Sequence, residues 1–414
     1  MIYGKRRPSP YGLRHINQSA KSFAILVKND EIVMFGNAVK IFSLNKFDIK
    51  VDPSWLLLAA LITWSLSRQY FPHVLPGADA TLYLTIAILA MLGLFASLLL
   101  HELAHSVVAR HFGVQIKSIT LFLFGGVAEL EQEPTSARVE FWIAVAGPAM
   151  SLCLAFAFWI LKHFAASSGS PVAPVELLSY LAIVNLVLAL FNLIPAFPLD
   201  GGRVLRAILW HKTGDILGAT RTAARSGTFL AYLLMSMGVI TLFQGAMASG
   251  MWQIMIGTFV LLASRASYTQ ELAKTAFEGR AVEALMTRNP VTVSPDMMLS
   301  DFVNQIMLQA HVTFVPVAEN DVLLGHIDAS VLASIERENW ATTRVGDVFV
   351  GLDTDIMIGA DMPVQDLLEQ ITATGRRKFM VVSDHDLLGV ITLSDLTQYL
   401  HAREQGQQIR QASR

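Results

Sequence analysis

Long apolar windows recur between residues 54 and 270 and constrain the fold more than any other feature of the sequence. Because about 20 apolar residues are needed to cross the hydrocarbon core, we expect about six membrane-spanning helices. Only 15% of the residues are charged, whereas soluble chains average roughly 25%. The sequence therefore predicts a polytopic α-helical membrane protein. The expected spans are 54–71, 80–109, 139–163, 176–197, 227–246 and 250–268.

Basic residues are distributed unevenly between the connections of these spans. They concentrate after the second, fourth and sixth spans, whereas the other connections hold little beyond Arg68 and Lys162. Since Lys and Arg are enriched in cytoplasmic loops, we expect a multi-pass protein of the cell (plasma or inner) membrane with both termini in the cytoplasm. The net charge of -2 lacks the basic excess of a nucleic-acid binder, so no nucleic-acid partner is expected.

A single cysteine, Cys153, lies inside an apolar segment. One cysteine excludes an intrachain disulfide framework and a cysteine-built zinc finger. We expect Cys153 to be a small, buried apolar side chain.

Residues 116–131 (IKSITLFLFGGVAELE) do not read as a membrane span. Their Ile, Thr, Leu and Phe residues favour strands, and Gly125-Gly126 interrupts the run as the turn of a β-hairpin would. An unpaired strand edge is tolerated at membrane depth only where it lines a protein cavity. The segment predicts a membrane-associated β-hairpin in a cleft, and an ordinary cytoplasmic linker is the alternative.

Three ionisable residues interrupt the second predicted span, in the sequence His101-Glu102-Leu103-Ala104-His105. Histidines at positions i and i+4 share one face of a helix, so both imidazoles can reach a single cation. A glutamate at i+1 lies close enough to act as a base on a water molecule at that cation. Ionisable groups at membrane depth are costly and face the bundle interior. The pattern predicts a metal centre, and a proton or ion pathway is the alternative.

A catalytic zinc ion takes three protein ligands and keeps a fourth position for water. The stretch NLVLALFNLIPAFPLDGGRVL (185–205), which begins in the fourth predicted span and runs past its end, offers one carboxylate, Asp200. Two prolines break the helix before Asp200 and two glycines let the backbone bend after it, which is a way to aim a polar group into a cavity. Asp200 is therefore the candidate third ligand. The alternative is that it caps a cytoplasmic helix starting near Arg203.

Two asparagines are the other polar residues considered in this span. The amide of Asn192 can hold a peptide backbone or a developing oxyanion. Asn185 is expected to form a hydrogen bond between helices.

After residue 278 charged residues return, and two segments repeat each other. DMMLSDFVNQI at 296–306 aligns with DMPVQDLLEQI at 361–371, and LLGHI at 323–327 aligns with LLGVI at 387–391. A period of about 64 residues indicates a duplicated supersecondary module, each copy reading strand–helix–strand–strand–helix. We therefore expect an α/β domain on the cytoplasmic side.

The two membrane motifs resemble those of the site-2 proteases, the intramembrane zinc metalloproteases of peptidase family M50. NLIPAFPLDGG at 192–202 matches the family's Asn-x-x-Pro-x-x-Pro-Leu-Asp-Gly pattern at every fixed position. FGG at 124–126 and AGP at 146–148 fit more loosely. The resemblance covers roughly residues 40–270.

This resemblance implies a zinc metalloendopeptidase with one zinc ion per chain. It implies His101, His105 and Asp200 as the metal ligands, Glu102 as the catalytic base and Asn192 as a substrate-binding residue. The implied activity is cleavage, within the lipid bilayer, of transmembrane segments of membrane-anchored regulatory proteins (regulated intramembrane proteolysis). Anti-sigma factors and tethered transcription regulators are the implied substrate class.

The duplicated module resembles a pair of CBS domains. The second copy carries GVITLSDL at 389–396, close to the family's Gly-x-x-Thr-x-x-Asp, whose Thr and Asp can contact an adenine nucleotide. Thr392 and Asp395 are therefore candidate nucleotide-binding residues, and helix capping is the alternative. The first copy has Asp328 and Val331 at these positions, which puts its equivalent site in doubt. By analogy the pair is a regulatory module and the contact of a homodimer.

Two other functions are open at this point. One is a CBS-regulated membrane ion transporter or channel, although a transporter would usually show an inverted repeat of its spans and neither membrane motif has a second copy. The other is a protease homologue that does not cleave. The expected organisation is a basic N-terminal segment (1–40) of a kind often disordered, the intramembrane metalloprotease core (41–270), a linker with the first CBS domain (271–340), the second CBS domain (341–400) and a polar tail (401–414).

Overall fold

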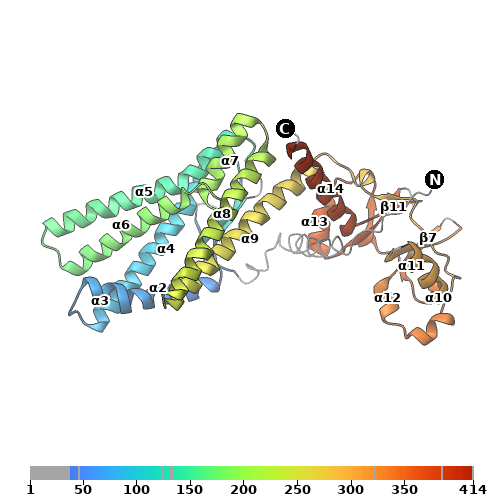
Figure 1. Cartoon of the computed structure of the whole chain (residues 1–414), viewed down its shortest axis with the longest axis horizontal. Coiled ribbons are helices and arrows are strands. Elements are labelled where there is room, and N and C mark those ends of the chain that lie inside the picture. Colours follow the sequence, from blue (N-terminus) through green and yellow to red (C-terminus); the bar gives the residue numbers. More distant parts are fainter. Residues whose placement is uncertain are drawn as a thin grey trace. The chain divides into compact units, whose positions relative to one another are not determined.

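The computed structural model describes residues 38–44, 47–122, 125–130, 134–310, 312–320, 322–383 and 386–412. The chain divides into two compact units at the boundary between Glu271 and Leu272. We call the part before this boundary the membrane unit and the part after it the C-terminal unit. In Figure 1 the elements of the C-terminal unit are orange to red. Residues 1–37 of the predicted N-terminal segment lie outside the described residues.

Five helices among the described residues are long and apolar enough to span a membrane. They are α4 (Ala80–His111), α5 (Ala137–Ser167), α6 (Val172–Asn192), α8 (Ile216–Phe243) and α9 (Met247–Phe277). They coincide with five of the six predicted spans. Large apolar side chains remain exposed along them, such as Phe156, Phe229 and Phe243, which is expected where the outer face of a helix meets lipid. A shorter helix, α7 (Asp200–Thr213), separates α6 from α8.

The predicted span at 54–71 is built differently, so the expected number of about six spanning helices is not exactly confirmed. The α-helix α2 (Ser54–Ser65) has only 12 residues, and the π-helical turn η1 (Leu66–Tyr70) and the short helix α3 (Phe71–Val74) follow it. Pro72 has no backbone N–H, so the regular i→i−4 hydrogen bonds cannot continue through it. The result is a composite helical run instead of one α-helix of spanning length.

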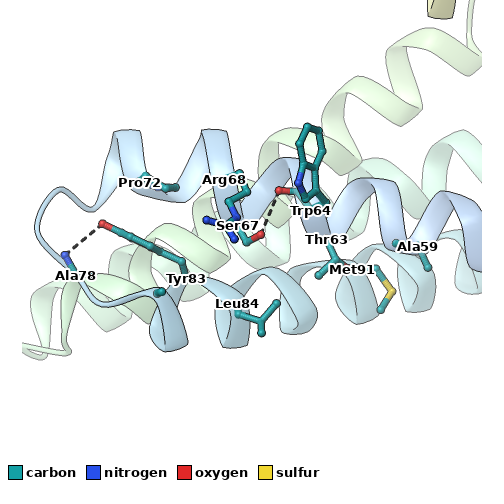
Figure 2. Close-up of a pocket in the computed structure, with 12 residues that line it drawn as sticks. Ala59, Thr63, Trp64, Ser67, Arg68, Pro72, Ala78, Tyr83, Leu84 and Met91 are labelled. Atoms are coloured by element: carbon teal, nitrogen blue, oxygen red, sulfur yellow. Dashed lines mark hydrogen bonds between the residues drawn. The ribbon is translucent and has the colours of Figure 1, made fainter. Parts of the chain in front are cut away.

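A cavity of about 860 Å³ lies between this composite run and the start of α4 (Figure 2). Its lining combines apolar side chains with Trp64, Arg68 and Tyr83. The Tyr83 hydroxyl donates to the carbonyl of Leu75 at 2.7 Å and accepts from the backbone N–H of Ala78 at 3.2 Å. These bonds tie the first turn of α4 to the loop that follows α3.

A four-stranded sheet of order β1-β2-β3-β4 belongs to the membrane unit. Its strands are β1 (Val39–Leu44), β2 (Phe47–Val51), β3 (Ile116–Phe122) and β4 (Gly125–Leu130). β3 and β4 pair antiparallel, which confirms the predicted hairpin, and β3 pairs parallel with β2. The expected turn at Gly125-Gly126 is wrong: both glycines lie inside β4, opposite Phe122 and Leu121. A glycine within a strand leaves room above the sheet instead of reversing the chain.

Two expectations about side chains inside the spanning helices have opposite outcomes. Asn185 of α6 donates from Nδ2 to the hydroxyl of Ser97 on α4 at 3.0 Å, so the predicted interhelical hydrogen bond is confirmed. Cys153 is exposed on α5, so its predicted burial is wrong. Its apolar surroundings in the sequence reflect a helix face that is suited to lipid, not a protein core.

Among its described residues, the C-terminal unit contains two sheets, of order β5-β11-β10-β9 and β6-β7-β8. The strands are β5 (Thr287–Arg288), β6 (Phe314–Glu319), β7 (Val322–Asp328), β8 (Val350–Gly351), β9 (Met357–Gly359), β10 (Lys378–Ser383) and β11 (Asp386–Thr392). The helices are α10 (Leu299–Asp301), the π-helical turn η3 (Phe302–Met307), α11 (Leu308–Ala310), α12 (Ala329–Ala333), α13 (Val364–Thr374) and α14 (Leu393–Ala412). Short 3-10 turns lie at Val282–Ala284, Arg337–Ala341, Val345–Asp347 and Thr354–Ile356.

The two sequence repeats exchange their first strands. β5, the first strand of the first repeat, pairs with β11 of the second, and β8, the first strand of the second repeat, pairs with β7 of the first. The equivalent glycines Gly389 and Gly325 take part in the two pairings. This reciprocal exchange agrees with the predicted duplication and makes the two copies one folding unit. The segment expected to be a polar tail continues α14 as far as Ala412.

Candidate metal centre

α4 places His101 and His105 one turn apart on a buried face of the helix. Their exposed fractions are 3% and 6%, and their rings meet edge to face with centroids 4.9 Å apart. The two Nε2 atoms are 3.2 Å apart. The i, i+4 spacing thus brings both imidazoles to one point.

Asp200, the first residue of α7, reaches the same point from the other membrane motif. Its Oδ2 lies 3.2 Å from Nε2 of His101 and 3.2 Å from Nε2 of His105. Among the described residues its side chain does not cap α7, whose N-cap is Leu199 with no side-chain hydrogen bond. The carboxylate is therefore turned toward the histidines, and α7 begins at Asp200 instead of near Arg203.

The three atoms form a triangle that suits a zinc ion. A backbone carbonyl only accepts, so the 2.7 Å contact between Nδ1 of His105 and the carbonyl of Ile143 places a proton on Nδ1. In the neutral ring the Nε2 atom then carries a lone pair toward the triangle. A tetrahedral zinc ion with bonds of about 2.0–2.2 Å would hold neighbouring ligand atoms about 3.3–3.6 Å apart. Both the donor set and the spacing fit this ion.

α5 supports the cluster from one of its faces, at positions i, i+4 and i+8. The carbonyl of Ile143 accepts from His105, and the hydroxyl of Ser151 lies 2.9 Å from Nδ1 of His101. Gly147 lies between them. A Cβ at Gly147 would collide with Nε2 of His105 and would lie 2.6 Å from Nε2 of His101, so only a glycine leaves space for the ligand atoms. Partners of this kind fix the orientation of metal-binding histidines.

Sequence reasoning missed the roles of Ile143 and Ser151, and it noted Gly147 only as part of AGP at 146–148. One signal could have revealed them. The three residues recur every fourth position, as the two histidines do, and residues four apart lie on one face of a helix.

The segment that leads to Asp200 is held mainly through its backbone. The N–H of Phe197 donates to the carbonyl of Ala223 at 3.2 Å, and the hydroxyl of Ser264 on α9 donates to the carbonyl of Phe197 at 2.6 Å. A Cβ on Gly201 would collide with the carbonyls of Leu193 and Ile194. This glycine therefore permits a close backbone approach, in addition to the bend that the sequence suggests.

Glu102 lies within α4, and Asn192 lies at the end of α6. Glu102 follows His101 on α4 and is half-buried. Asn192, the last residue of α6, is also half-buried, and no hydrogen bond joins it to the cluster among the described residues.

Thr392 and Asp395 cap α14 in the C-terminal unit. Oδ2 of Asp395 accepts from both the backbone N–H and the hydroxyl of Thr392 at 2.8 Å, and the N–H of Asp395 donates to the Thr392 hydroxyl oxygen at 3.3 Å. This reciprocal pattern is a capping box. The structure thus provides for these residues the helix-capping role that the sequence left as an alternative.

The chain matches the sequence models of two families. One is described as Peptidase family M50 and covers residues 89–170 and 163–236, and the other is the CBS domain, at residues 282–334 and 345–402. "Putative zinc metalloprotease Rip3" of Mycobacterium tuberculosis is 35% identical over 366 residues, which cover 88% of this chain and 93% of that protein. "Zinc metalloprotease MJ0392" of Methanocaldococcus jannaschii is 32% identical over 305 residues, which cover 73% and 82% of the two chains.

One similar solved structure is described as "Site-2 Protease from Methanocaldococcus jannaschii". It shares 30% sequence identity and covers 56% of this chain and 95% of that chain, with a TM-score of 0.39. Taken with the long relatives, the buried cluster defines the class of the molecule as a membrane zinc metalloprotease. The chain belongs to peptidase family M50, the site-2 protease family, and carries a C-terminal pair of CBS domains. This membership confirms both predicted resemblances and favours an enzyme over a transporter.

Proposed function

We propose that the chain is an intramembrane zinc endopeptidase that cleaves transmembrane segments of membrane-anchored regulatory proteins, such as anti-sigma factors or tethered transcription regulators, in regulated intramembrane proteolysis. One observation carries the proposal. Three ligand atoms, from His101, His105 and Asp200, converge in the interior of a unit made of helices of spanning length. This location suits a substrate whose scissile peptide bond lies within a membrane-spanning segment.

His101, His105 and Asp200 hold one zinc ion per chain in this proposal. Zinc supplies a Lewis acid that polarises a carbonyl group and makes a water molecule more acidic. Glu102 takes the proton of the attacking water and later passes it to the leaving amine nitrogen. Asn192 donates from its side-chain amide to the substrate backbone or to the developing oxyanion.

The outer strand β4 receives the substrate. In a helical substrate the scissile amide is engaged in the hydrogen bonds of its own helix, so the segment must become extended before attack. β4 is the last strand in the sheet order and lies beside α4, which carries both histidines. Addition of an extended peptide to such an edge supplies main-chain hydrogen bonds along its length.

The remaining assignments are part of the same proposal. The protein lies in the cell membrane with both termini in the cytoplasm, since basic residues concentrate in the connections on that side. The CBS pair regulates the protease, binds an adenine nucleotide near Thr392 and Asp395, and forms the contact of a homodimer. The metalloprotease core comprises residues 41–270, the linker with the first CBS domain 271–340 and the second CBS domain 341–400.

The test uses the purified full-length protein in lipid nanodiscs with a panel of single-span substrates. We expect cleavage inside the span that a zinc chelator stops and added zinc restores. Glu102→Gln is expected to keep one zinc ion per chain and to lose turnover, whereas Glu336→Gln in the C-terminal unit leaves turnover unchanged. Cleavage that persists in the chelator, or in Glu102→Gln, would contradict the proposal.

A further inference from the structure

Arg206 lies on α7, the helix that Asp200 begins, and it is paired with two buried carboxylates. Its Nε donates to Oε1 of Glu140 on α5 at 2.6 Å, and its Nη1 donates to Oε2 of Glu271 on α9 at 3.3 Å. Glu140 and Glu271 are only 0% and 4% exposed. One guanidinium group therefore joins three helices of the membrane unit.

The same guanidinium covers Phe197, in the segment that leads into Asp200. Its Cζ lies 5.3 Å from the centroid of the Phe197 ring, a geometry in which the cation is attracted to the ring face. Arg206 thus holds both the helix that starts at Asp200 and the residue three positions before it. Among the described residues its hydrogen bonds go to Glu140 and Glu271 and not to the three ligand atoms, so we expect it to act on the site through the position of Asp200.

α9 contacts this assembly along a single face. Ser264 donates to the carbonyl of Phe197, Tyr268 packs against the apolar cluster that contains Phe197, and Glu271 pairs with Arg206. Their spacing of i, i+4 and i+7 places all three on one side of the helix. A shift of α9 along its axis would therefore move all three contacts to the Asp200 segment together.

The same helix ends in the core of the second CBS repeat. Phe277 is 1% exposed and stacks on Tyr399 of α14 with ring centroids 5.9 Å apart. Arg403 of α14 donates to the carbonyls of Thr275 and Ala276 at 3.2 and 2.7 Å. Glu271 precedes Phe277 by less than two turns of the same continuous helix.

We propose that Arg206 is a positioning residue for Asp200, and that Glu271 is the contact through which α9 makes the metal centre depend on the state of the CBS pair. The inference rests on the proposed function, because it treats Asp200 as a zinc ligand. When the end of α9 shifts, the pairing of Glu271 with Arg206 changes. Arg206 then re-seats against Glu140 and Phe197, and Oδ2 of Asp200 moves relative to the two histidines.

Two matched variants distinguish the contact of Arg206 with Glu271, which we propose transmits a shift of α9, from its contact with Glu140, which we propose does not. Glu271→Gln and Glu140→Gln each remove one carboxylate charge and keep the side-chain shape, and each leaves Arg206 paired with the other glutamate. Neither variant leaves the buried guanidinium without a carboxylate partner, a change that would strongly destabilise the fold. A variant without a cation at position 206 would leave two buried carboxylates unpaired. Arg206 is therefore tested with the conservative variant Arg206→Lys.

The first experiment tests transmission in the full-length protein in nanodiscs. Arg403→Met, which releases the end of α9, is introduced into wild type, Glu271→Gln and Glu140→Gln. Zinc retention is measured against graded chelator, and hydrogen exchange is measured for the amides of residues 193–203. We expect Arg403→Met to change both readouts by at least about threefold in wild type and in Glu140→Gln, but not in Glu271→Gln. Equal effects in all three backgrounds would overturn the transmitting role.

The second experiment tests positioning. Arg206→Lys keeps the charge but loses the forked geometry, and we expect about tenfold weaker zinc retention and faster exchange at 193–203. Arg225→Lys, at an exposed position on α8, is the matched control and is expected to change neither. Unchanged exchange in Arg206→Lys would overturn the positioning role. The exchange readout needs neither zinc nor substrate, so a failure of the proposed proteolysis and a failure of this inference give different results.

Discussion

Nε2 of His101 lies 3.2 Å from Oδ2 of Asp200, across 99 positions of the sequence. The same oxygen lies 3.2 Å from Nε2 of His105, whose own Nδ1 proton is already donated to the carbonyl of Ile143. Lone pairs of acceptor atoms therefore point toward one buried place. They repel one another unless a cation lies among them. The first two predictions follow from this close approach of the three ligand atoms.

Asp200→Asn keeps the size of the side chain and removes its charge. We expect zinc retention to fall by more than the 10–100-fold typical of an outer partner, because a ligand is lost. The measurement is zinc per chain in the full-length protein after dialysis against graded chelator. Asp215→Asn is the control, since Asp215 only caps α8 by accepting from the N–H of Gly218. Wild-type retention in Asp200→Asn would contradict the assignment of this ligand.

Gly147→Ala adds one methyl group at the point where α5 faces the two histidines. The new Cβ would collide with Nε2 of His105, so we expect the variant to fold with displaced imidazoles and to lose both zinc and turnover. The control is Gly406→Ala, because Gly406 of α14 has nothing near its missing Cβ. A Gly147→Ala protein with wild-type zinc content would show that α5 does not limit the space available to the two imidazoles and the zinc ion.

Much of the site could be predicted from the sequence because its signals are local. The i, i+4 spacing of the histidines and the proline-flanked Asp200 each describe one stretch of chain, and ionisable residues in apolar spans are rare enough to stand out. The hairpin at 116–131 was recognisable for the same reason, since strand composition and a short connection are local properties.

The remaining features depend on which helices become neighbours, and the sequence does not state this. Gly147 and Ser151 acquire their roles only because α5 packs beside α4, and Arg206 acquires its own only where α5, α7 and α9 meet. The pairing of β2 with β3 likewise joins strands that are far apart in the chain. A glycine, a serine and an arginine are common residues, so no local pattern singles them out.

Ser151→Ala removes the hydroxyl that lies 2.9 Å from Nδ1 of His101. We expect zinc retention about tenfold weaker with turnover partly kept, because the ring loses its orienting partner but not its ligand atom. Ser179→Ala is a matched control in α6, where the hydroxyl accepts instead from Lys162. Chelator titration of both proteins measures the difference, and equal retention would exclude an orienting role for Ser151.

A pH dependence is expected in the first CBS repeat. His326 of β7 lies against Phe314, and burial lowers its pKa, with Lys378 and Arg376 adding to the shift while Asp328 and Asp353 oppose it. The unfolded chain therefore binds this proton more readily than the folded chain. The contribution of His326 to the free energy of unfolding is therefore fully present above the ordinary histidine pKa of about 6.5, and it is lost as the pH falls below that value.

The measurement is hydrogen exchange of the β7 amides in the full-length protein, corrected for the intrinsic rate, from about pH 7.5 to about pH 5.5. We expect protection to decrease toward the lower pH in wild type. His326→Gln cannot titrate in this range and is expected to lose that decrease. An identical pH dependence in both proteins would assign it to another group.

Thr392→Val separates helix capping from nucleotide binding in the second CBS repeat. The variant loses the hydroxyl that donates to Asp395 and accepts from its N–H, so exchange protection in the first turn of α14 should fall about fivefold, equivalent to ~1 kcal/mol. Thr372→Val in α13 is the control.

Calorimetric titration of the full-length protein with ATP and AMP then tests the proposed nucleotide site. We expect binding heat in wild type and in Thr372→Val that Thr392→Val weakens, because an adenine nucleotide would use the same hydroxyl. Heat that is unchanged in Thr392→Val, or absent from wild type, would leave these two residues as a helix cap alone.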